Sequence, residues 1–475
     1  MSGFVPFLMQ MPEDAWEIPD RDWIRENFGP RLLVEYTRSF RFTRPLTASD
    51  WEPVYKCSHR VKNLLLCYTP PKIAKALRTC PPPRTLFPNL RQCNLLDGEV
   101  SPELVDHLLP PSLAFLETHG PAGLYPVFPL TLRFPHLASL HVSCPDNKMG
   151  PQGVLYTVDA LHVAQQLETL SICAGDGPAV LAAASASPAI TTLRAVGITD
   201  KSIPPCLSSD SFSSLKAIHM SGPHSIQFAV QLLESCPIRP LQSVAIQSSP
   251  WEALQLPHLL QVIAQRCEAR TLRDLSVDVE RDLQILGQSY PAREYDDTLR
   301  LEHLEPLSSF RLQGVRIGTT RGPSLTDADY ATVASWWPSL NALRLSCSCH
   351  YRTDGDVPAA TLNALTAIVS GCPDLEYLDI PIDARVVPNV PSVQHGSLWR
   401  LGVNDAPITD PEAVAAFLSS LLPELYCLEY DDGYREPDSD FEDDVPPPDP
   451  NAPDAKRRQL WAMVRETMGV EEDPL

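Results

Sequence analysis

The chain has 475 residues, of which 44% are hydrophobic, and a formal net charge of −21 at pH 7. This length exceeds what one hydrophobic core normally supports, and this apolar content excludes a wholly disordered chain. The acidic balance and the lack of a basic stripe argue against nucleic acid as the main partner. No apolar run approaches the roughly 18 residues of a membrane-spanning helix, so no membrane insertion is expected.

The first predicted element is a short helix close to residue 51. Trp51, Val54 and Tyr55 have the spacing of one apolar helix side, and Ser49 or Asp50 is suited to cap its first turn. We interpret residues 1–56 as a helical cap that shields the end of a repeat array.

A short apolar pattern recurs along most of the chain. It reads apolar-x-x-apolar-x-apolar, as in Leu375, Leu378 and Ile380 of the stretch GCPDLEYLDI. Thirteen copies follow one another at a mean spacing of about 28 residues, and a further copy from Val61 makes fourteen. The first apolar residues of the thirteen copies are Leu90, Leu113, Leu137, Leu167, Ile190, Leu215, Leu241, Leu272, Leu307, Leu340, Leu375, Leu398 and Leu425.

The segments between the copies are predicted to be helices. Before the last copy, Asp410 is a suitable N-cap and Pro411 suits the first helical position. A proline ends such a helix, and a short alternating strand follows, so that each repeat is helix, proline turn and strand. Helical spacing of apolar residues occurs in Val414, Phe417, Leu418 and Leu421, in Ile226, Ala229, Val230 and Leu233, and in Tyr330, Val333, Ala334 and Trp337.

One such unit cannot bury both its helix and its strand, whereas stacked units form a continuous core. The pattern resembles leucine-rich repeats of the long, helix-containing kind, and we assign residues 57–430 to one repeat domain. The resemblance implies an α/β solenoid of about 13–14 irregular repeats, with a curved parallel sheet on the concave side and helices outside. The asparagine or cysteine that this family places after the last apolar position is absent, because other residues stand there: Pro145, Gly175, Ser348 and Asp383.

The strand register predicts a surface for a protein partner. Apolar residues point into the core, so the residues between and just before them face the concave side. Mixed charge and a tyrosine favour a protein partner, and a solvated sheet face without a ligand is the alternative. The predicted partner-binding residues are His141, Ser171, Arg194, His219, Asp274, Ser276, Arg311, Arg344, Tyr377, Asp379, Arg400 and Glu429. Reversing the charge of Arg311, Arg344 and Arg400 is expected to weaken partner capture and to leave the melting temperature nearly unchanged.

The stretch after the repeats is acidic and rich in proline. Residues 431–455 contain few large apolar side chains, so we expect a disordered linker there. Residues 456–475 are predicted to contain a short helix that caps the last repeat. Its apolar side is formed by Trp461, Val464 and Met468.

No motif of an enzyme is present. The sequence contains no H-E-x-x-H zinc motif, no phosphate-binding G-x-x-x-x-G-K loop and no G-x-S-x-G nucleophile elbow. Cys347, Cys349 and His350 lie together, but a zinc site needs a second ligand pair at suitable spacing. We therefore predict no catalytic residue, no cofactor and no metal site.

The N-terminal segment carries a narrower resemblance. Arg44-Pro45-Leu46, Asp50-Trp51 and Arg60-Val61 precede the first leucine-rich strand, and MPEDAWEI occupies residues 11–18. These runs resemble the opening of fungal F-box/leucine-rich-repeat proteins, especially those of mushroom-forming fungi. In that family an F-box comes before this point and docks on the Skp adaptor of a cullin–RING ubiquitin ligase, and the repeats hold the substrate.

An intact F-box is not evident in this sequence. An F-box should open with Leu-Pro beside an apolar helix, and only ten residues precede Met11. Two explanations stay open. Either MPEDAW and a helix over Trp23–Tyr36 form a degenerate F-box, or the chain starts downstream of the F-box.

These features together predict a protein-interaction module. The leading hypothesis is a monomeric substrate-recognition subunit that binds a protein substrate for a ubiquitin ligase. The alternative is a leucine-rich-repeat scaffold or adaptor without a ligase link. The 13 cysteines are an odd number without paired spacing, which indicates reduced thiols and a cytoplasmic or nuclear location.

Overall fold

The chain divides into two compact units, Met1–Leu215 with His219–Ser221 and Lys216–Ile218 with Gly222–Leu475. Trp23–Tyr36, where a helix was predicted, and residues 431–451 of the predicted linker lie outside the described residues. The computed structural model describes residues 5–18, 39–66, 71–95, 107–119, 134–143, 158, 161, 166–173, 178–198, 208, 210–279, 298–347, 357–389, 393–430 and 452–470.

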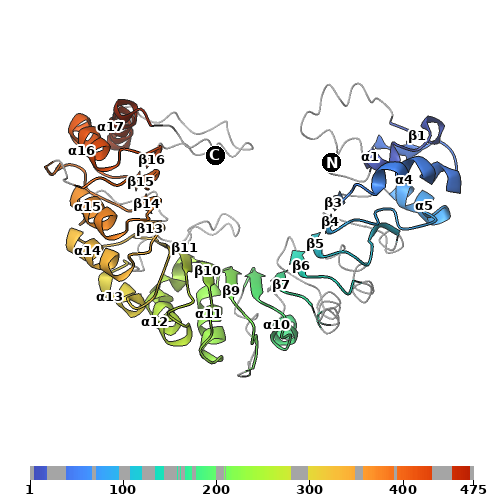
Figure 1. Cartoon of the computed structure of the whole chain (residues 1–475), viewed down its shortest axis with the longest axis horizontal. Coiled ribbons are helices and arrows are strands. Elements are labelled where there is room, and N and C mark those ends of the chain that lie inside the picture. Colours follow the sequence, from blue (N-terminus) through green and yellow to red (C-terminus); the bar gives the residue numbers. More distant parts are fainter. Residues whose placement is uncertain are drawn as a thin grey trace. The chain divides into compact units, whose positions relative to one another are not determined.

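The first unit is built on parallel strands that follow chain order (Figure 1). Each of its strands pairs in parallel with the next one along the chain. Helices α5 (Pro71–Thr79) and α10 (Pro178–Ser185) connect some of them. The strands are β3 (Asn63–Leu66), β4 (Gln92–Leu95), β5 (Phe115–His119), β6 (Ser139–Ser143), β7 (Thr169–Cys173) and β8 (Thr192–Val196), and β9 (Ala217–Ser221) has residues in both units.

The second unit repeats the same plan. Its helices α11, α12, α14, α15 and α16 lie on one side of its strands, and their faces toward the strands are apolar (Figure 1). The strands are β10 (Ser243–Ser248), β11 (Asp274–Val279), β12 (Gly314–Thr319), β13 (Ala342–Cys347), β14 (Tyr377–Asp379), β15 (Arg400–Asn404) and β16 (Cys427–Tyr430). The helices are α11 (Ser225–Glu234), α12 (Leu256–Arg266), α13 (Leu301–Leu304), α14 (Asp327–Trp336), α15 (Leu362–Gly371), α16 (Pro411–Leu421) and α17 (Pro453–Met468), with 3-10 helices η5 (Pro250–Gln255) and η7 (Glu305–Leu307).

Equivalent apolar residues of successive strands are register partners, which explains why the pattern recurs. All of these side chains are buried, so each repeat adds one layer to the core. In the second unit the row runs through Leu275, Val315, Leu343, Leu378, Leu401 and Leu428. Fourteen parallel strands in chain order, with helices between many of them, form an α/β leucine-rich-repeat solenoid, as predicted.

Helix α16 begins where the sequence predicts. The Asp410 side chain accepts a hydrogen bond from the backbone N–H of Ala413 at 3.0 Å, and Pro411 is the first helical residue. All twelve side chains of the three predicted apolar stripes, on α11, on α16, and on α14 with Trp337, are buried. The helical side of the repeat was therefore predicted correctly.

Carboxylates bridge the helix starts of neighbouring repeats. Glu252 accepts hydrogen bonds from the backbone N–H groups of Ile226, at 2.8 Å, and Gln227, at 2.9 Å, in the first turn of α11. Asp327 of α14 accepts from the N–H of Thr361, the N-cap of α15, at 2.6 Å and from its hydroxyl at 2.7 Å. These bonds satisfy helix N-terminal donors from the adjacent repeat and orient one repeat on the next.

One predicted repeat was placed in the wrong frame. The predicted copy begins at Leu307, but β12 aligns with β11 through Val315 and Ile317, so the first apolar residue of this copy is Leu312. Leu307, Phe310 and Leu312 match the same pattern and are all buried, so the sequence offers two overlapping frames. Strand pairing selects the later one.

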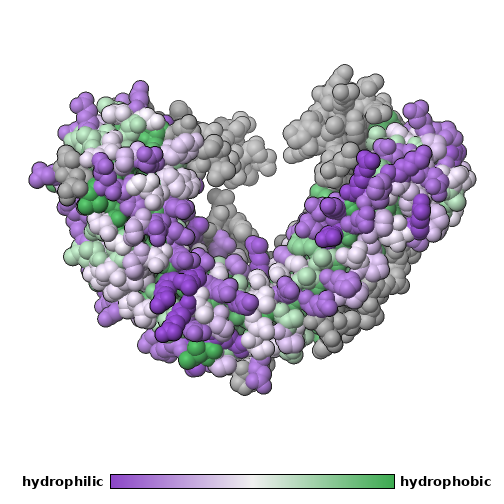
Figure 2. All heavy atoms as spheres, viewed as in Figure 1, coloured by the Kyte–Doolittle hydropathy of each residue, from purple (hydrophilic) through white to green (hydrophobic). Residues whose placement is uncertain are grey.

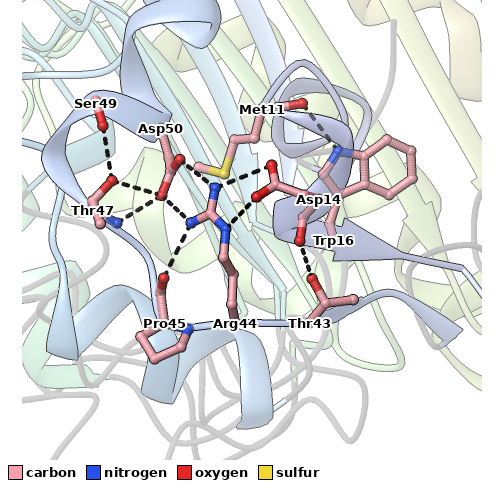
Figure 3. A network of polar contacts seen from close by, with 9 residues as sticks. All are labelled: Met11, Asp14, Trp16, Thr43, Arg44, Pro45, Thr47, Ser49 and Asp50. Carbon is pink, nitrogen blue, oxygen red and sulfur yellow. Dashed lines mark hydrogen bonds and ion pairs between the residues drawn. The ribbon is translucent and has the colours of Figure 1, made fainter.

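The N-terminal cap is held by Arg44 (Figure 3). Its guanidinium donates to both oxygens of Asp14, at 2.7 and 3.2 Å, and to both oxygens of Asp50, at 2.8 and 2.9 Å. Arg44 and Asp14 belong to segments joined by the antiparallel pair β1 (Trp16–Glu17) and β2 (Arg41–Phe42). Arg44, Asp14 and Asp50 therefore form one contact network between two segments of the N-terminal cap.

The helix start near residue 51 differs in its cap from the prediction. A 3-10 helix, η3 (Ala48–Trp51), precedes α4 (Glu52–Ser58), and Thr47 is its N-cap. Asp50 accepts a hydrogen bond from the backbone N–H of Thr47 at 2.7 Å. Asp50 is therefore the N3 residue of a capping box, and Thr47 is its N-cap. Trp51 and Val54 are fully buried, as their spacing predicts.

The C-terminal helix covers the last repeat. α17 begins at Pro453, three residues before the predicted segment, and packs against α16 (Figure 1). Trp461 is 1% exposed and its indole N–H donates to the carbonyl of Ala406 at 2.8 Å. Val464 is also buried, whereas Met468 is partly exposed. None of the helices in the described ranges is long and apolar enough to cross a membrane.

Replacing Asp50 by Asn tests the Arg44 network. The guanidinium of Arg44 holds the pKa of Asp50 well below its usual value. A carboxyl whose pKa is lowered by folding contributes stability above the unfolded pKa of about 4, and this contribution is lost as the pH falls through the folded pKa. We expect D50N to melt at a lower temperature than the wild type at pH 7, and the gap to narrow below about pH 4.

Thermal unfolding followed by circular dichroism from pH 7 to pH 2 measures this gap. E13Q, at an exposed neighbouring carboxylate, is the matched control and should follow the wild type. A constant gap between D50N and the wild type across this range would contradict the account.

Candidate protein-binding surfaces

The sheet face opposite the helices carries eleven of the twelve predicted residues. Arg311 is the exception, because it lies before β12 and is exposed there; Arg316 takes the outward strand position instead. On the first unit the predicted residues are His141, Ser171, Arg194 and His219. On the second unit they are Asp274, Ser276, Arg344, Tyr377, Asp379, Arg400 and Glu429.

Arginines and carboxylates alternate across the second unit's sheet face. Arg316 pairs with Asp278 at 2.6 Å. Arg344 pairs with Asp379 at 2.9 Å. Arg400 pairs with Glu429 on the next strand. The three arginine side chains remain 45%, 34% and 25% exposed, so each is held in place and still accessible.

Asp379 is the buried centre of this surface. Its side chain is 3% exposed, and it accepts a hydrogen bond from Asn404 Nδ2 at 2.5 Å in addition to the Arg344 ion pair. Burial raises the pKa of Asp379 above its usual value, although Arg344 and Asn404 favour the charged form. Asp379 therefore depends on its two partners, and it positions Arg344 rather than facing solvent itself.

Glycines make room for the carboxylates of this face. Gly318 is the register partner of Asp278, and Gly402 is the register partner of Asp379. A Cβ added at Gly402 would lie 2.8 Å from the Asp379 carboxylate, which is too close. A glycine inside a strand thus marks a close approach between neighbouring strands.

Aromatic side chains accompany the arginines. Arg400 lies over the ring of Tyr377 at 5.3 Å, and burial raises the pKa of that tyrosine. Trp399 and Tyr426 directly precede β15 and β16, and are 43% and 47% exposed. Figure 2 shows apolar residues in small groups among hydrophilic ones on the face it presents. Exposed aromatics beside arginine are the composition that binding hot spots favour.

The first unit's sheet face is arranged differently. Asn94 donates to Glu117 at 2.6 Å, and the ring of His141 lies 4.9 Å from that of Phe115. Burial, and then the charge of Arg194, lower the pKa of His219; burial lowers the pKa of His141 against the opposing effect of Glu117. Both imidazoles therefore favour the neutral form more than a free histidine does.

The described residues offer little for catalysis or metal binding. Among them no group of three or more His, Cys, Asp or Glu side chains could hold a metal ion. Cys349 and His350 of the cysteine-rich stretch lie outside the described residues. Burial raises the pKa of Cys267 to about 12 and that of Cys372 to about 11, which disfavours reactive thiolates. Cys372 is buried at the end of α15.

Sequence reasoning missed Arg316, Asp278 and the exposed pair Trp399 and Tyr426. Arg316 was missed because the overlapping apolar frame shifted the expected strand by five residues. Gly314 and Gly318 could have indicated the true strand. A glycine inside a strand marks a place where a side chain of the neighbouring strand comes close. Trp399 and Tyr426 stand at equivalent positions of two successive repeats. The alignment of the repeats could therefore have identified them as a pair.

No family model matches the sequence, and no protein with a curated description matches it. Among solved structures, the leucine-rich-repeat-containing protein LegL7 from Legionella pneumophila is 14% identical, with a TM-score of 0.33, over 87% of this chain and 99% of that chain. An internalin from Listeria monocytogenes is 11% identical, with a TM-score of 0.36, over 90% of this chain and 97% of that one. Likeness at this level carries no argument about function, and the fold class rests on the repeats themselves.

Removing Arg344 should destabilise the second unit. Breaking a buried ion pair by removing one partner costs about 3–5 kcal/mol, and we expect about 2 kcal/mol for R344Q because the arginine is one-third exposed. We therefore now expect an unchanged melting temperature for a change at Arg311, which is exposed, and not for a change at Arg344. The double variant R344Q/D379N should recover part of the loss, because no buried charge is left unpaired.

Urea unfolding followed by circular dichroism measures these differences. R311Q is the matched control, since Arg311 is exposed and lies outside the strand. Equal stability of R344Q and R311Q would contradict the assigned role of Arg344.

Proposed function

We propose that this chain is a non-catalytic protein-interaction module that binds a protein partner on the helix-free face of its second unit. The observation that carries the proposal is the set of three accessible arginines, each held by a carboxylate, together with Trp399 and Tyr426, which are exposed directly before the strands of Arg400 and Glu429. Side chains fixed before binding lose little entropy when a partner arrives. Arginine and aromatic side chains also supply most of the energy in protein interfaces.

The finer proposal is that the partner is a substrate delivered to a ubiquitin ligase. It is supported by the resemblance to fungal F-box/leucine-rich-repeat proteins, whose matching residues Arg44, Asp50 and Asp14 form one network here. The alternative is a scaffold or adaptor without a ligase link. A monomeric state and a cytoplasmic or nuclear location belong to the same proposal.

A photo-crosslinking amino acid at position 399 tests partner binding directly. In cells, this position should form a crosslink to another protein, because Trp399 is 43% exposed beside Arg400. The same amino acid at position 238, where Ile238 is 67% exposed after α11, is the control and should give little product. Y426A should reduce the yield at position 399 by about tenfold, as expected for a hot-spot aromatic, while L254A should leave it unchanged.

Equal crosslinking from positions 399 and 238 would overturn the proposed surface. The ligase link has its own readout, which is co-purification with the Skp adaptor. The 475-residue chain and a version extended upstream at the genomic locus should be compared. If neither form carries the adaptor while position 399 still crosslinks, the scaffold alternative stands.

A further inference from the structure

Four neighbouring positions on the first unit's sheet face form a row with positive charge. His141, Ser171 and Arg194 are register partners on β6, β7 and β8, and His219 stands at the equivalent position of β9. We call these four residues the Arg194 row. Strand residues 139–143, 169–173, 192–196 and 217–221 contain no Asp or Glu, although the whole chain has 59 of them.

A second row, of hydroxyls, runs beside it. Ser139, Thr169 and Thr192 are register partners and are partly exposed. Hydroxyl groups can donate hydrogen bonds to an anion, and the arginine fork matches carboxylate and phosphoryl oxygens. These four strands therefore present donors and positive charge and carry no carboxylate, and Glu117 on β5, the register partner of His141, lies at one end of the row.

Arg194 differs from the arginines of the second unit. Arg316, Arg344 and Arg400 each have a carboxylate partner, whereas Arg194 is exposed and forms no ion pair or side-chain hydrogen bond with another described residue. Its charge lowers the pKa of His141 and of His219, and these two histidines do not neutralise it. Its charge is thus uncompensated within the part of the chain that the structure describes.

We propose that the Arg194 row binds an acidic segment of the protein partner, through carboxylate or phosphoryl side chains on an extended backbone. Neighbouring strands are about 4.8 Å apart, so the row spans about 14 Å, the length of roughly five extended residues. A single anionic group is too small to reach both histidines, whereas a segment with several such groups can follow the row. This inference rests on the proposed function, because it names the chemistry of a protein partner.

The histidines make this binding depend on pH. The charged groups that act on His141 are Glu117 on β5 and Arg194 on β8, and the charged group that acts on His219 is Arg194. β7 carries no ionisable residue other than Cys173, and β10 carries none. A bound anion offsets the charge of Arg194 and favours protonated imidazoles, so binding takes up protons and strengthens as the pH falls.

Fluorescence anisotropy with the full chain and labelled peptides tests the proposal. The probes are a peptide of alternating Glu and Ser, its matched Gln and Ser version, and a version with phosphoserine in place of Glu. The Glu or the phosphoserine peptide should bind, more tightly at pH 6 than at pH 8 and more weakly at high salt. Tighter binding of the phosphoserine peptide assigns the site to phosphoryl groups, and tighter binding of the Glu peptide assigns it to carboxylates.

Variants connect the binding to the row. R194Q should weaken binding about tenfold, and H141Q/H219Q should remove the difference between pH 6 and pH 8. R91Q is the matched control, because Arg91 is exposed in the same unit and lies before β4. Circular dichroism checks that each variant is folded.

Three results would overturn the inference. They are equal binding of the Gln peptide, equal effects of R194Q and R91Q, and tighter binding of a single-stranded oligonucleotide than of either acidic peptide. Crosslinking from position 399 reports on the second unit alone. If that crosslink persists while R194Q has no effect, this inference fails and the proposed function does not.

Discussion

Burial of each repeat's apolar face by the next repeat is the interaction on which the rest of the structure depends. A strand of three to six residues and one short helix expose more apolar surface than they can cover alone. Register pairing stacks buried side chains such as Leu343, Leu378 and Leu401 into one row, and each layer closes the layer before it. The two ends of the array therefore need capping segments. Trp51 is buried in the cap of the first unit, and Trp461 is buried in the cap of the second.

The same stacking produces the candidate surfaces. Because one strand residue points inward and the next outward, every buried row is accompanied by an outward row that the apolar core does not constrain. In the second unit this row holds paired charges, with Asp379 buried beneath Arg344 and Asn404. In the first unit it holds His141 and Arg194 without a neighbouring carboxylate on their own strands. The two surfaces therefore suit different chemistry, although they arise from one repeat plan.

Much of this could be predicted from the sequence, because spacing alone determines which residues share a face. The apolar stripe of α16, its cap Asp410 and the strand frame of thirteen of the fourteen copies follow from local patterns. The remaining frame, at Leu307, could not be predicted, since two overlapping matches are equally apolar and only pairing with β11 separates them. Neighbouring residues across strands, such as Asp379 and Gly402, also depend on register between distant segments, which local patterns do not contain. The cap at Thr47 was missed for a smaller reason: the preceding 3-10 turn moves the helix start upstream.

The central claim is that the helix-free face of the second unit receives a protein partner. Hydroxyl-radical footprinting of the chain, alone and with the protein recovered by crosslinking, tests it most directly, because oxidation reports the exposure of individual side chains. The account predicts strong protection of Trp399 and Tyr426 in the complex, and unchanged oxidation of Ile238, Leu254 and Met463, which are exposed elsewhere. Protection of these three residues, with Trp399 and Tyr426 still oxidised, would contradict it.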